Sequence, residues 1–453
     1  MTIQTESQQP FKVIDLAYAT LLVACFMAFA GYRGTTRPGM DWLWPTMNDH
    51  LGAEYNSISK SIVSGRGFSD PFQTQSGPTA WMAPILSYLL AVMYWFYDGD
   101  IDEVVRLFLI LKAMVITFAG TIIISVSRQL GLLWIGYAMF PIGLCANFFQ
   151  LFQMTHDVEL LLLNVCLLWL GLNYYWQPTK AWHYQITWGV FGGFAALCSP
   201  AIGMAWAICS LTATVSTLRR VNFSAAQRWK IIGSLATLAL VSMFVVAPWT
   251  IRNRVVMGKW IPIKSNLSFE IWQSQCLDDD GVLDAVTTGQ HLWPYDGPER
   301  RRYVEVGETE FLKEKWSPVT ESILRSPTGW LRRVANRFVC ATLYYHSYTA
   351  AYERWVWPMR FKRLVYVLPF LSVVAGLILK RRSRAAAQFL NAIQIYVVVL
   401  MPYILVSYDD RYVVSLLPIK LLLILYAINA LLSPFQYQIA NEDNPISTLC
   451  KGA

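Results

Sequence analysis

Three carboxylates lie next to apolar segments of the chain, where an acidic side chain could take a proton from a hydroxyl group or orient that group. Asp49 and Glu54 stand in the polar stretch after the first apolar segment, and Asp157 immediately precedes a later one. An alcohol with a pKa far above 7 needs a positioned base when it attacks, and such a base contributes about a hundred- to ten-thousandfold in rate. Ile58 and Ile62 follow Glu54 at four-residue steps, so the spacing predicts that Glu54 lies on an amphipathic helix.

Each of these residues also has a purely structural interpretation. Glu54 and Asp49 fit solvated acids of a loop, and Asp157 fits the N-cap of the helix that follows it. Residue type and spacing leave both interpretations open, so the role of the three carboxylates depends on the elements that position them.

Composition places these residues at a membrane. Of the 453 residues, 55% are apolar and only 15% are charged, whereas a soluble domain carries about 25% charged residues. The mean hydropathy is +0.37, and the apolar residues gather in blocks of about twenty, the length that crosses a bilayer as a helix. The net charge of +8 comes mostly from Lys and Arg beside these blocks, so it indicates membrane topology and implies no nucleic-acid partner.

Ten spans are predicted, at residues 13–31, 104–126, 131–149, 158–175, 185–198, 200–217, 231–248, 364–379, 387–406 and 412–432. An even number puts both termini on one side of the membrane. Two basic clusters fall in loops on that side, and the positive-inside rule makes it cytoplasmic. They are Arg219, Arg220, Arg228 and Lys230, and Lys380, Arg381, Arg382 and Arg384. Residues 82–97 are short for a span, and we expect an interfacial or re-entrant helix there, on the outer face.

These spans divide the chain into six regions. They are 1–31, the N-terminus and first span; 32–103, a first outer loop with juxtamembrane helices; 104–248, the transmembrane core; 249–363, an extracytoplasmic insert; 364–432, the C-terminal spans; and 433–453, a cytoplasmic tail. Both long polar regions lie outside, so the chemistry is expected there. Cys276 and Cys340 fall in the insert, where an oxidising compartment would allow them to pair.

Several separated motifs follow one another in the polar regions. The first outer loop carries GRGFS at 65–69 and GPTAWMAP at 77–84, and the region after the seventh span carries PWTIRN at 248–253 and PIKSNLSFE at 262–270. Two less specific motifs are GETEF at 307–311 and DDRYVVSLLPI at 409–419. In this order the motifs resemble those of bacterial GT-C glycosyltransferases, the multi-spanning enzymes related to protein O-mannosyltransferases and the lipid A aminoarabinose transferase.

The resemblance implies an all-α polytopic membrane protein, a GT-C-like bundle of about ten transmembrane helices with helical extracytoplasmic loops. It implies inverting transfer of a sugar from a polyprenyl-phosphate carrier to a hydroxyl acceptor, which is a glycolipid, a polysaccharide or a protein. In that family an acid of the first outer loop deprotonates the acceptor. Glu54 matches this position best and Asp49 next. The paired Asp-Glu common in the family is Asp-His here, which leaves the choice between Glu54 and Asp49 open. Asp157 would assist by orienting the acceptor or a sugar hydroxyl.

A departing lipid phosphate gains negative charge, so cationic partners are expected at the outer membrane face. Arg252 and Arg411 are favoured, and Lys264 and Arg254 are weaker candidates. Lys420 lies about eight residues into the last span, where a buried ammonium needs a partner, so it either faces the carrier's phosphate or snorkels to the interface. The predicted substrate-binding residues are Arg252, Asn253, Glu270, Arg411, Tyr412 and Lys420.

Two other functions are compatible with the sequence. A transporter or flippase of lipid-linked sugars would carry polar residues inside its spans, and apart from Lys420 the predicted spans have few. A non-catalytic scaffold would tolerate neutral replacement of Glu54, Asp49 and Asp157. The sequence has neither a phosphate loop nor metal-ligand spacing, so no cofactor is identified and a need for a divalent metal is left open. The expected location is the bacterial inner membrane, with the active site outside and both termini cytoplasmic.

Overall fold

The computed structural model describes most of the chain and is built from α-helices. The described residues are 12–36, 51–72, 75–152, 157–220, 223–277, 280–283, 292, 297–343, 362–383 and 385–442, and no β-strand occurs among them. Asp49 lies outside the described residues. The expectation of an all-α polytopic membrane protein is confirmed, because long apolar helices make up the bundle.

Eight helices are long and apolar enough to cross a membrane. They are α1 (Val13–Thr36), α5 (Ile101–Gln129), α8 (Val158–Leu170, prolonged by a π-helical turn, Gly171–Tyr175), α10 (Pro200–Arg220), α11 (Ala225–Met257), α18 (Lys362–Leu379), α19 (Ala386–Leu405) and α20 (Leu417–Glu442). The two remaining predicted spans form α6 (Leu133–Ala146) and α9 (Trp182–Cys198), of 14 and 17 residues. The helix α6 is shorter than the predicted span 131–149 because it ends before Asn147. The helix α9 ends where predicted, before the extended residue Ser199, and begins three residues earlier than the predicted span 185–198.

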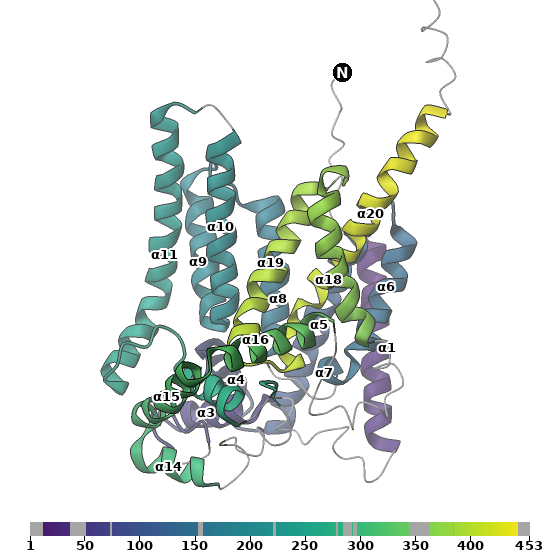
Figure 1. Cartoon of the computed structure of the whole chain (residues 1–453). Helices are drawn as coiled ribbons and strands as arrows, with labels where there is room; N and C mark the ends of the chain where they lie inside the picture. Colours follow the sequence, from purple (N-terminus) through teal and green to yellow (C-terminus); the bar gives the residue numbers. More distant parts are fainter. Residues whose placement is uncertain are drawn as a thin grey trace, which may run out of the picture.

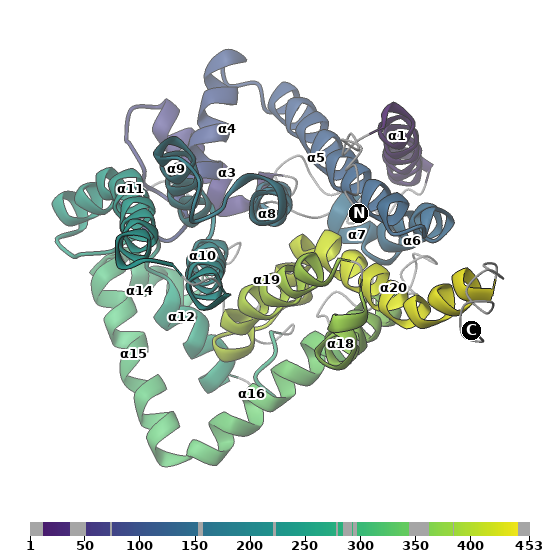
Figure 2. The same ribbon diagram turned by 90° about the horizontal axis from the view of Figure 1, so that it is seen from above.

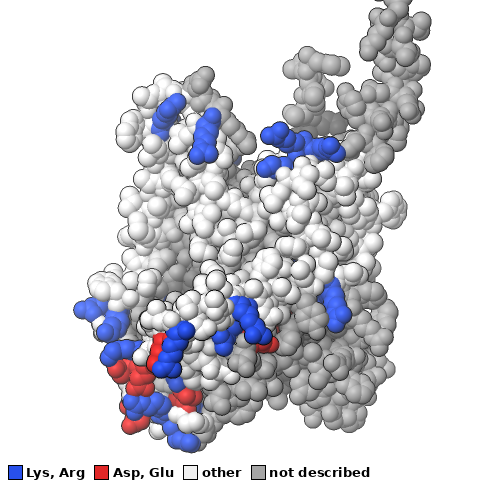
Figure 3. All heavy atoms as spheres, viewed as in Figure 1, with Lys and Arg blue, Asp and Glu red and all other residues white. Residues whose placement is uncertain are grey.

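Charged side chains separate the two ends of the bundle. Lys and Arg gather at the upper end in Figure 3, at the loop between α10 and α11 and at the turn η5 (Lys380–Arg382) between α18 and α19. At the lower end Lys and Arg are mixed with Asp and Glu. The two basic loops therefore lie at the same end, and α1 begins and α20 ends there too (Figure 1).

Short helices cover the lower end. They are α3 (Ala53–Val63), α4 (Pro84–Phe96), α7 (Phe148–Phe152), α12 (Leu267–Trp272), α14 (Pro298–Val306), α15 (Glu308–Arg325) and α16 (Pro327–Thr342). Figures 1 and 2 show α15 and α16 lying across the bundle rather than along it. The stretch at 82–97 forms α4, whose 13 residues are too few to span a bilayer, and α4 packs against α3.

Small residues bring α9 close to its neighbours. A β-carbon on Gly192 would lie 2.3 Å from the Trp206 ring of α10, and one on Gly193 would lie 2.5 Å from Val245 of α11. Lipid tails are as apolar as the side chains, so the hydrophobic effect does not drive helices together in a bilayer. Van der Waals contact at such close approach is therefore a main source of packing energy. It fixes the tight connection between α9 and α10, which carries Ser199 and Pro200 at the lower end.

Ion pairs connect the spans, and two of the three are fully buried while Arg128 in the third is partly exposed. Lys112 of α5 meets Glu159 of α8 at 2.7 Å, Lys362 of α18 pairs with Asp410, and Arg128 of α5 pairs with Asp15 of α1. The spans thus hold more charge than the sequence analysis expected. In these three pairs, the opposite charges neutralise each other between helices that are distant in the sequence, which suits a role in packing.

Glu308 joins the polar segments at the lower end of the bundle to one another. Its buried carboxylate accepts hydrogen bonds from the Thr79 hydroxyl at 2.5 Å, the Ala80 amide at 2.9 Å, the Ser265 hydroxyl at 2.7 Å and the Tyr303 hydroxyl at 2.8 Å. Burial raises the pKa of this carboxyl group, and the donors oppose that rise. One side chain therefore connects the loop before α4, the loop before α12, and α14.

Replacing Glu308 with alanine is expected to loosen the whole lower end. Three buried donors and the part-buried Ser265 hydroxyl would lose their acceptor, and an unsatisfied buried donor costs about 1–3 kcal/mol. The midpoint of thermal unfolding in detergent should fall by more than about 3 °C. Glu310→Ala is the matched control, because Glu310 lies on the same helix in an exposed ion pair with Lys313. Equal midpoints for the two variants would contradict this role of Glu308.

Candidate functional site

A cavity of about 300 Å³ lies where the lower ends of the spans meet the short helices. Its walls come from α3, the residues before α4, α8, the α9–α10 connection, α12 with the loop before it, α19, and the 3₁₀ helix η6 (Asp410–Leu416). The lining residues are Tyr55, Met82, Ala83, Asp157, Leu161, Cys198, Ser199, Pro200, Ala201, Lys264, Asn266, Leu267, Glu270, Pro402, Tyr403, Val406, Ser407, Arg411 and Tyr412. The cavity thus brings together Asp157, Glu270, Arg411 and Tyr412, which the sequence analysis had singled out separately.

Asp157 lies in this cavity immediately before α8. Its backbone is left-handed, with φ of 65°, and its side chain makes no hydrogen bond that caps the helix. A non-glycine residue in that conformation costs about 1–3 kcal/mol and often marks a functional position. The Tyr55 hydroxyl donates a long hydrogen bond of 3.5 Å to the Asp157 carboxylate. The carboxylate is therefore aimed at the cavity instead of at the helix end.

The surroundings of Asp157 suit a base. Burial raises the pKa of its carboxyl group to about 7, and the nearby cations Arg411 and Lys264 partly oppose that rise. A general base is most effective when its pKa is close to the working pH, because it is then both deprotonated and basic enough. Asp157 meets that condition near neutrality.

Two cationic side chains enter the cavity from different elements. Arg411 comes from η6, and Lys264 comes from the loop between α11 and α12. The backbone amide of Arg411 donates to the Asp409 carboxylate at 2.8 Å, which fixes the start of η6. The Arg411 guanidinium lies 5.2 Å from the centre of the Tyr412 ring. Together the two cations can bind an anionic group, such as a phosphate.

Polar and aromatic groups form another part of the wall. Glu270 of α12 accepts a hydrogen bond from the Asn266 amide at 3.0 Å. This bond uses one of the two carboxylate oxygens of Glu270. The Tyr403 and Tyr412 rings stack with centres 5.0 Å apart and planes 19° apart. A flat aromatic pair beside a carboxylate can hold a small polyhydroxylated ring, with one face on the aromatic surface and its hydroxyls on the acid.

The remainder of the wall is apolar. Leu161, Ala201 and Pro402 belong to α8, α10 and α19, so this side of the cavity is built from the ends of membrane spans. A cavity with charges on one side and span ends on the other fits an amphiphilic ligand, whose head enters the polar part while its tail stays at the membrane.

Arg252 and Asn253 have structural contacts outside the cavity lining. The Arg252 guanidinium donates to the carbonyl oxygens of Phe68 at 2.5 Å and Thr79 at 2.6 Å, and it lies 5.1 Å from the Trp249 ring centre. The Asn253 amide donates to the carbonyl oxygen of Ile261 at 2.8 Å. Both side chains therefore join α11 to neighbouring loops.

Other predicted residues lie apart from the lining. Glu54 is buried at the start of α3, one residue before Tyr55, and is not among the lining residues. Lys420 is 1% exposed, with its ammonium 4.1 Å from the centre of the Tyr366 ring. It is therefore packed inside the bundle and does not snorkel. Cys276 and Cys340 are both free, so the pairing considered for them does not occur.

Sequence reasoning missed Tyr55 and Tyr403, and it ranked Lys264 low. Tyr55 follows the candidate Glu54 directly, and this adjacency was the signal that could have found it. Tyr403 sits in an apolar span with nothing to distinguish it from other span aromatics. Its place in the cavity depends on how α19 packs against its neighbours.

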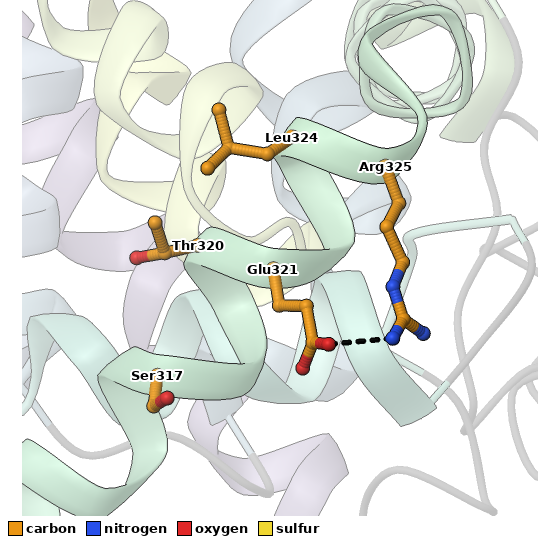
Figure 4. Close-up of a pocket in the computed structure, with 5 residues that line it drawn as sticks. All are labelled: Ser317, Thr320, Glu321, Leu324 and Arg325. Carbon is orange, nitrogen blue, oxygen red and sulfur yellow. Dashed lines mark ion pairs between the residues drawn. The ribbon is translucent and has the colours of Figure 1, made fainter.

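A second hollow lies on the surface of α15 (Figure 4). Its labelled residues, Ser317, Thr320, Glu321, Leu324 and Arg325, all come from that helix, and Glu321 pairs with Arg325 at 2.6 Å. Among the described residues, no other element contributes to its lining. The cavity at Asp157 differs, because groups from several elements meet there.

Neither a metal-ligand cluster nor a related protein helps to assign a function to this cavity. Within the described part of the chain, no three His, Cys, Asp or Glu side chains are grouped as metal ligands would be. Neither a protein-family model, nor a curated protein, nor a solved structure matches the chain.

Proposed function

We propose that this protein is an inverting glycosyltransferase that moves a sugar from a polyprenyl-phosphate carrier to a hydroxyl acceptor. The observation that carries the proposal is the convergence of Asp157, Arg411, Lys264 and Glu270 on one cavity at the ends of membrane spans. A base, two cations and an apolar side are what a lipid-linked sugar donor needs. The motif resemblance points to the same reaction.

The proton acceptor in this proposal is Asp157, in place of Glu54 or Asp49, because Asp157 lines the cavity, Glu54 is not among the lining residues, and Asp49 lies outside the described residues. The acceptor's hydroxyl oxygen forms a bond to the anomeric carbon while the bond from that carbon to the phosphate oxygen breaks. The hydroxyl proton passes to the Asp157 carboxylate, and the electron pair of the broken bond leaves with polyprenyl phosphate. Attack from the face opposite the phosphate inverts the anomeric configuration.

Arg411 and Lys264 hold the phosphate. Its charge grows as the bond to the sugar breaks, so cations placed beforehand stabilise the transition state more than the bound donor. Glu270 and the Tyr403–Tyr412 pair take the sugar ring, and Glu54 supports Asp157 from α3 through its neighbour Tyr55. The bacterial inner membrane is the proposed site of action.

The proposed orientation puts the cavity outside and both termini in the cytoplasm. The basic loops at the opposite end of the bundle support it, because cytoplasmic loops carry an excess of Lys and Arg. A polyprenyl tail can then remain in the bilayer while its phosphate and sugar enter the cavity at the outer boundary.

A transporter of lipid-linked sugars is the second candidate function. The pairs Lys112–Glu159 and Lys362–Asp410 join helices, but they also place buried charges in or beside the spans, and such charges often serve transport. Such a protein would move the donor across a bilayer and leave the bond between sugar and phosphate intact.

A transfer assay separates the two functions. Purified protein in nanodiscs is incubated with a panel of radiolabelled polyprenyl-phosphate sugars and a cell-envelope extract, and both labelled product and released polyprenyl phosphate are measured. Wild type is expected to transfer the sugar, and Glu54→Gln should transfer it at a reduced rate. Asp157→Asn should lose transfer. Donor that binds and crosses proteoliposomes without release of polyprenyl phosphate would favour the transporter instead.

A further inference from the structure

Arg337 on α16 is buried without lining the cavity. Its side chain is 1% exposed, although it carries five N–H donors and a positive charge. Its guanidinium donates to the carbonyl oxygens of Ile404 at 2.6 Å, Leu405 at 3.1 Å and Gly281 at 3.2 Å. Burial lowers its pKa to about 10, so Arg337 stays charged at neutral pH.

Two of these carbonyls belong to the last turn of α19. The final four carbonyls of a helix have no partner within the helix, and a cation is favoured at that end by the helix dipole. Arg337 supplies both the donors and the charge from another element, and α16 packs against α19 (Figure 1). The end of α19 is thus held by the outer insert.

The chain that leaves α19 builds one wall of the cavity. Within nine residues it supplies Val406, Ser407, Arg411 and Tyr412 to the lining. The same stretch is held at further points from outside the cavity. The Ser274 hydroxyl donates to the Val406 carbonyl at 2.5 Å, and the Leu283 amide donates to the Tyr408 carbonyl at 3.1 Å.

Its far end is anchored in the bundle. Asp410 pairs with Lys362 of α18 and accepts a hydrogen bond of 2.7 Å from the Gln150 amide of α7. The next residue, Arg411, points into the cavity. Residues 404–412 are therefore fixed at the α19 end by Arg337 and at the η6 end by Asp410, and the position of Arg411 depends on both.

We infer that Arg337 is a positioning residue for the phosphate-binding side of the cavity: it fixes the end of α19 and thereby the placement of Arg411 and Tyr412. This inference rests on the proposed function for its ligand. Displacing a charged group by about 1 Å can cost roughly a hundredfold in rate. Loss of these carbonyl contacts should therefore displace Arg411 and lower the rate.

Two measurements on the full-length protein test this role. The first is hydrogen–deuterium exchange of the peptide covering residues 403–412, with no ligand present. Arg337→Gln should speed exchange there by about tenfold, Arg337→Lys by less, and Arg332→Gln should leave it as in wild type. Arg332 is the matched control, because it is exposed on the same helix. Unchanged exchange in Arg337→Gln would overturn the inference, whether or not the protein is a transferase.

The second measurement is binding of undecaprenyl phosphate in nanodiscs. Arg337→Gln should raise Kd by about tenfold and Arg337→Lys by about threefold, but in an Arg411→Gln background the Arg337→Gln change should add less than about twofold. A tenfold effect that persists in the Arg411→Gln background would overturn action through Arg411. Absence of binding by wild type would count against the proposed function, and the exchange measurement would then decide the positioning role alone.

Discussion

Replacing Asp157 with asparagine is expected to slow sugar transfer by about a hundred- to ten-thousandfold, because the amide cannot accept the hydroxyl proton. Binding of undecaprenyl phosphate should stay as tight as in wild type or become tighter. The reason is electrostatic: the Asp157 carboxylate lies close enough to Arg411 to be influenced by its charge, and it repels a phosphate bound there. Single-turnover kinetics and a binding isotherm measure the two effects separately.

The same variant changes the pH profile. With a pKa of about 7 for Asp157, the wild-type rate should rise through neutral pH and fall about tenfold for each pH unit below it, since only the carboxylate form accepts a proton. In Asp157→Asn the residual rate should lose this acid limb. Tyr55→Phe is the matched control, because it removes only the long hydrogen bond to Asp157 and should cost less than about tenfold. A full-rate Asp157→Asn variant would exclude Asp157 as the base.

Replacing Arg411 with glutamine is expected to lower kcat/KM by about a hundred- to a thousandfold, because the developing phosphate charge would lose its strongest partner. It should weaken binding of undecaprenyl phosphate, in contrast to Asp157→Asn. Arg411→Lys keeps the charge without the planar fork of donors, so its loss should be smaller.

A shift in pH dependence accompanies the loss. Arg411 lowers the pKa of Asp157, so removing its charge raises that pKa, and the acid limb of the variant should move to higher pH. Arg254→Gln is the matched control, because Arg254 is exposed on α11 beside the Trp260 ring. If Arg254→Gln and Arg411→Gln lose the same activity, the phosphate is not held at Arg411.

The sequence predicted the architecture well because apolar blocks and basic loops are strong local signals. Residues 82–97 illustrate this: their length argued against a span, and they form the 13-residue α4 at the lower end. The ends of α6 were harder to predict, because the helix breaks before Asn147 and apolar composition does not reveal that break. The end of α9 at Cys198 was predicted correctly, and only its start was placed three residues too late.

Part of the cavity could be foreseen for a topological reason. Asp157 and Arg411 each lie beside a span end on the same side, and span ends on one side of a bundle are brought together. Arg252 and Arg254 show the limit. They are two residues apart on α11, yet the Arg252 guanidinium packs against the Phe68 and Trp249 rings, whereas Arg254 is exposed. Which of the two arginines is buried depends on tertiary packing, and residue spacing alone does not predict it.

A cryo-EM structure of the protein in nanodiscs with undecaprenyl phosphate tests the central claim most directly. The phosphate is predicted within about 3 Å of the Arg411 and Lys264 side chains, with the tail leaving past the apolar wall formed by α8, α10 and α19. A phosphate bound elsewhere, for example beside Lys420, or an empty cavity at saturating ligand would contradict the proposed site.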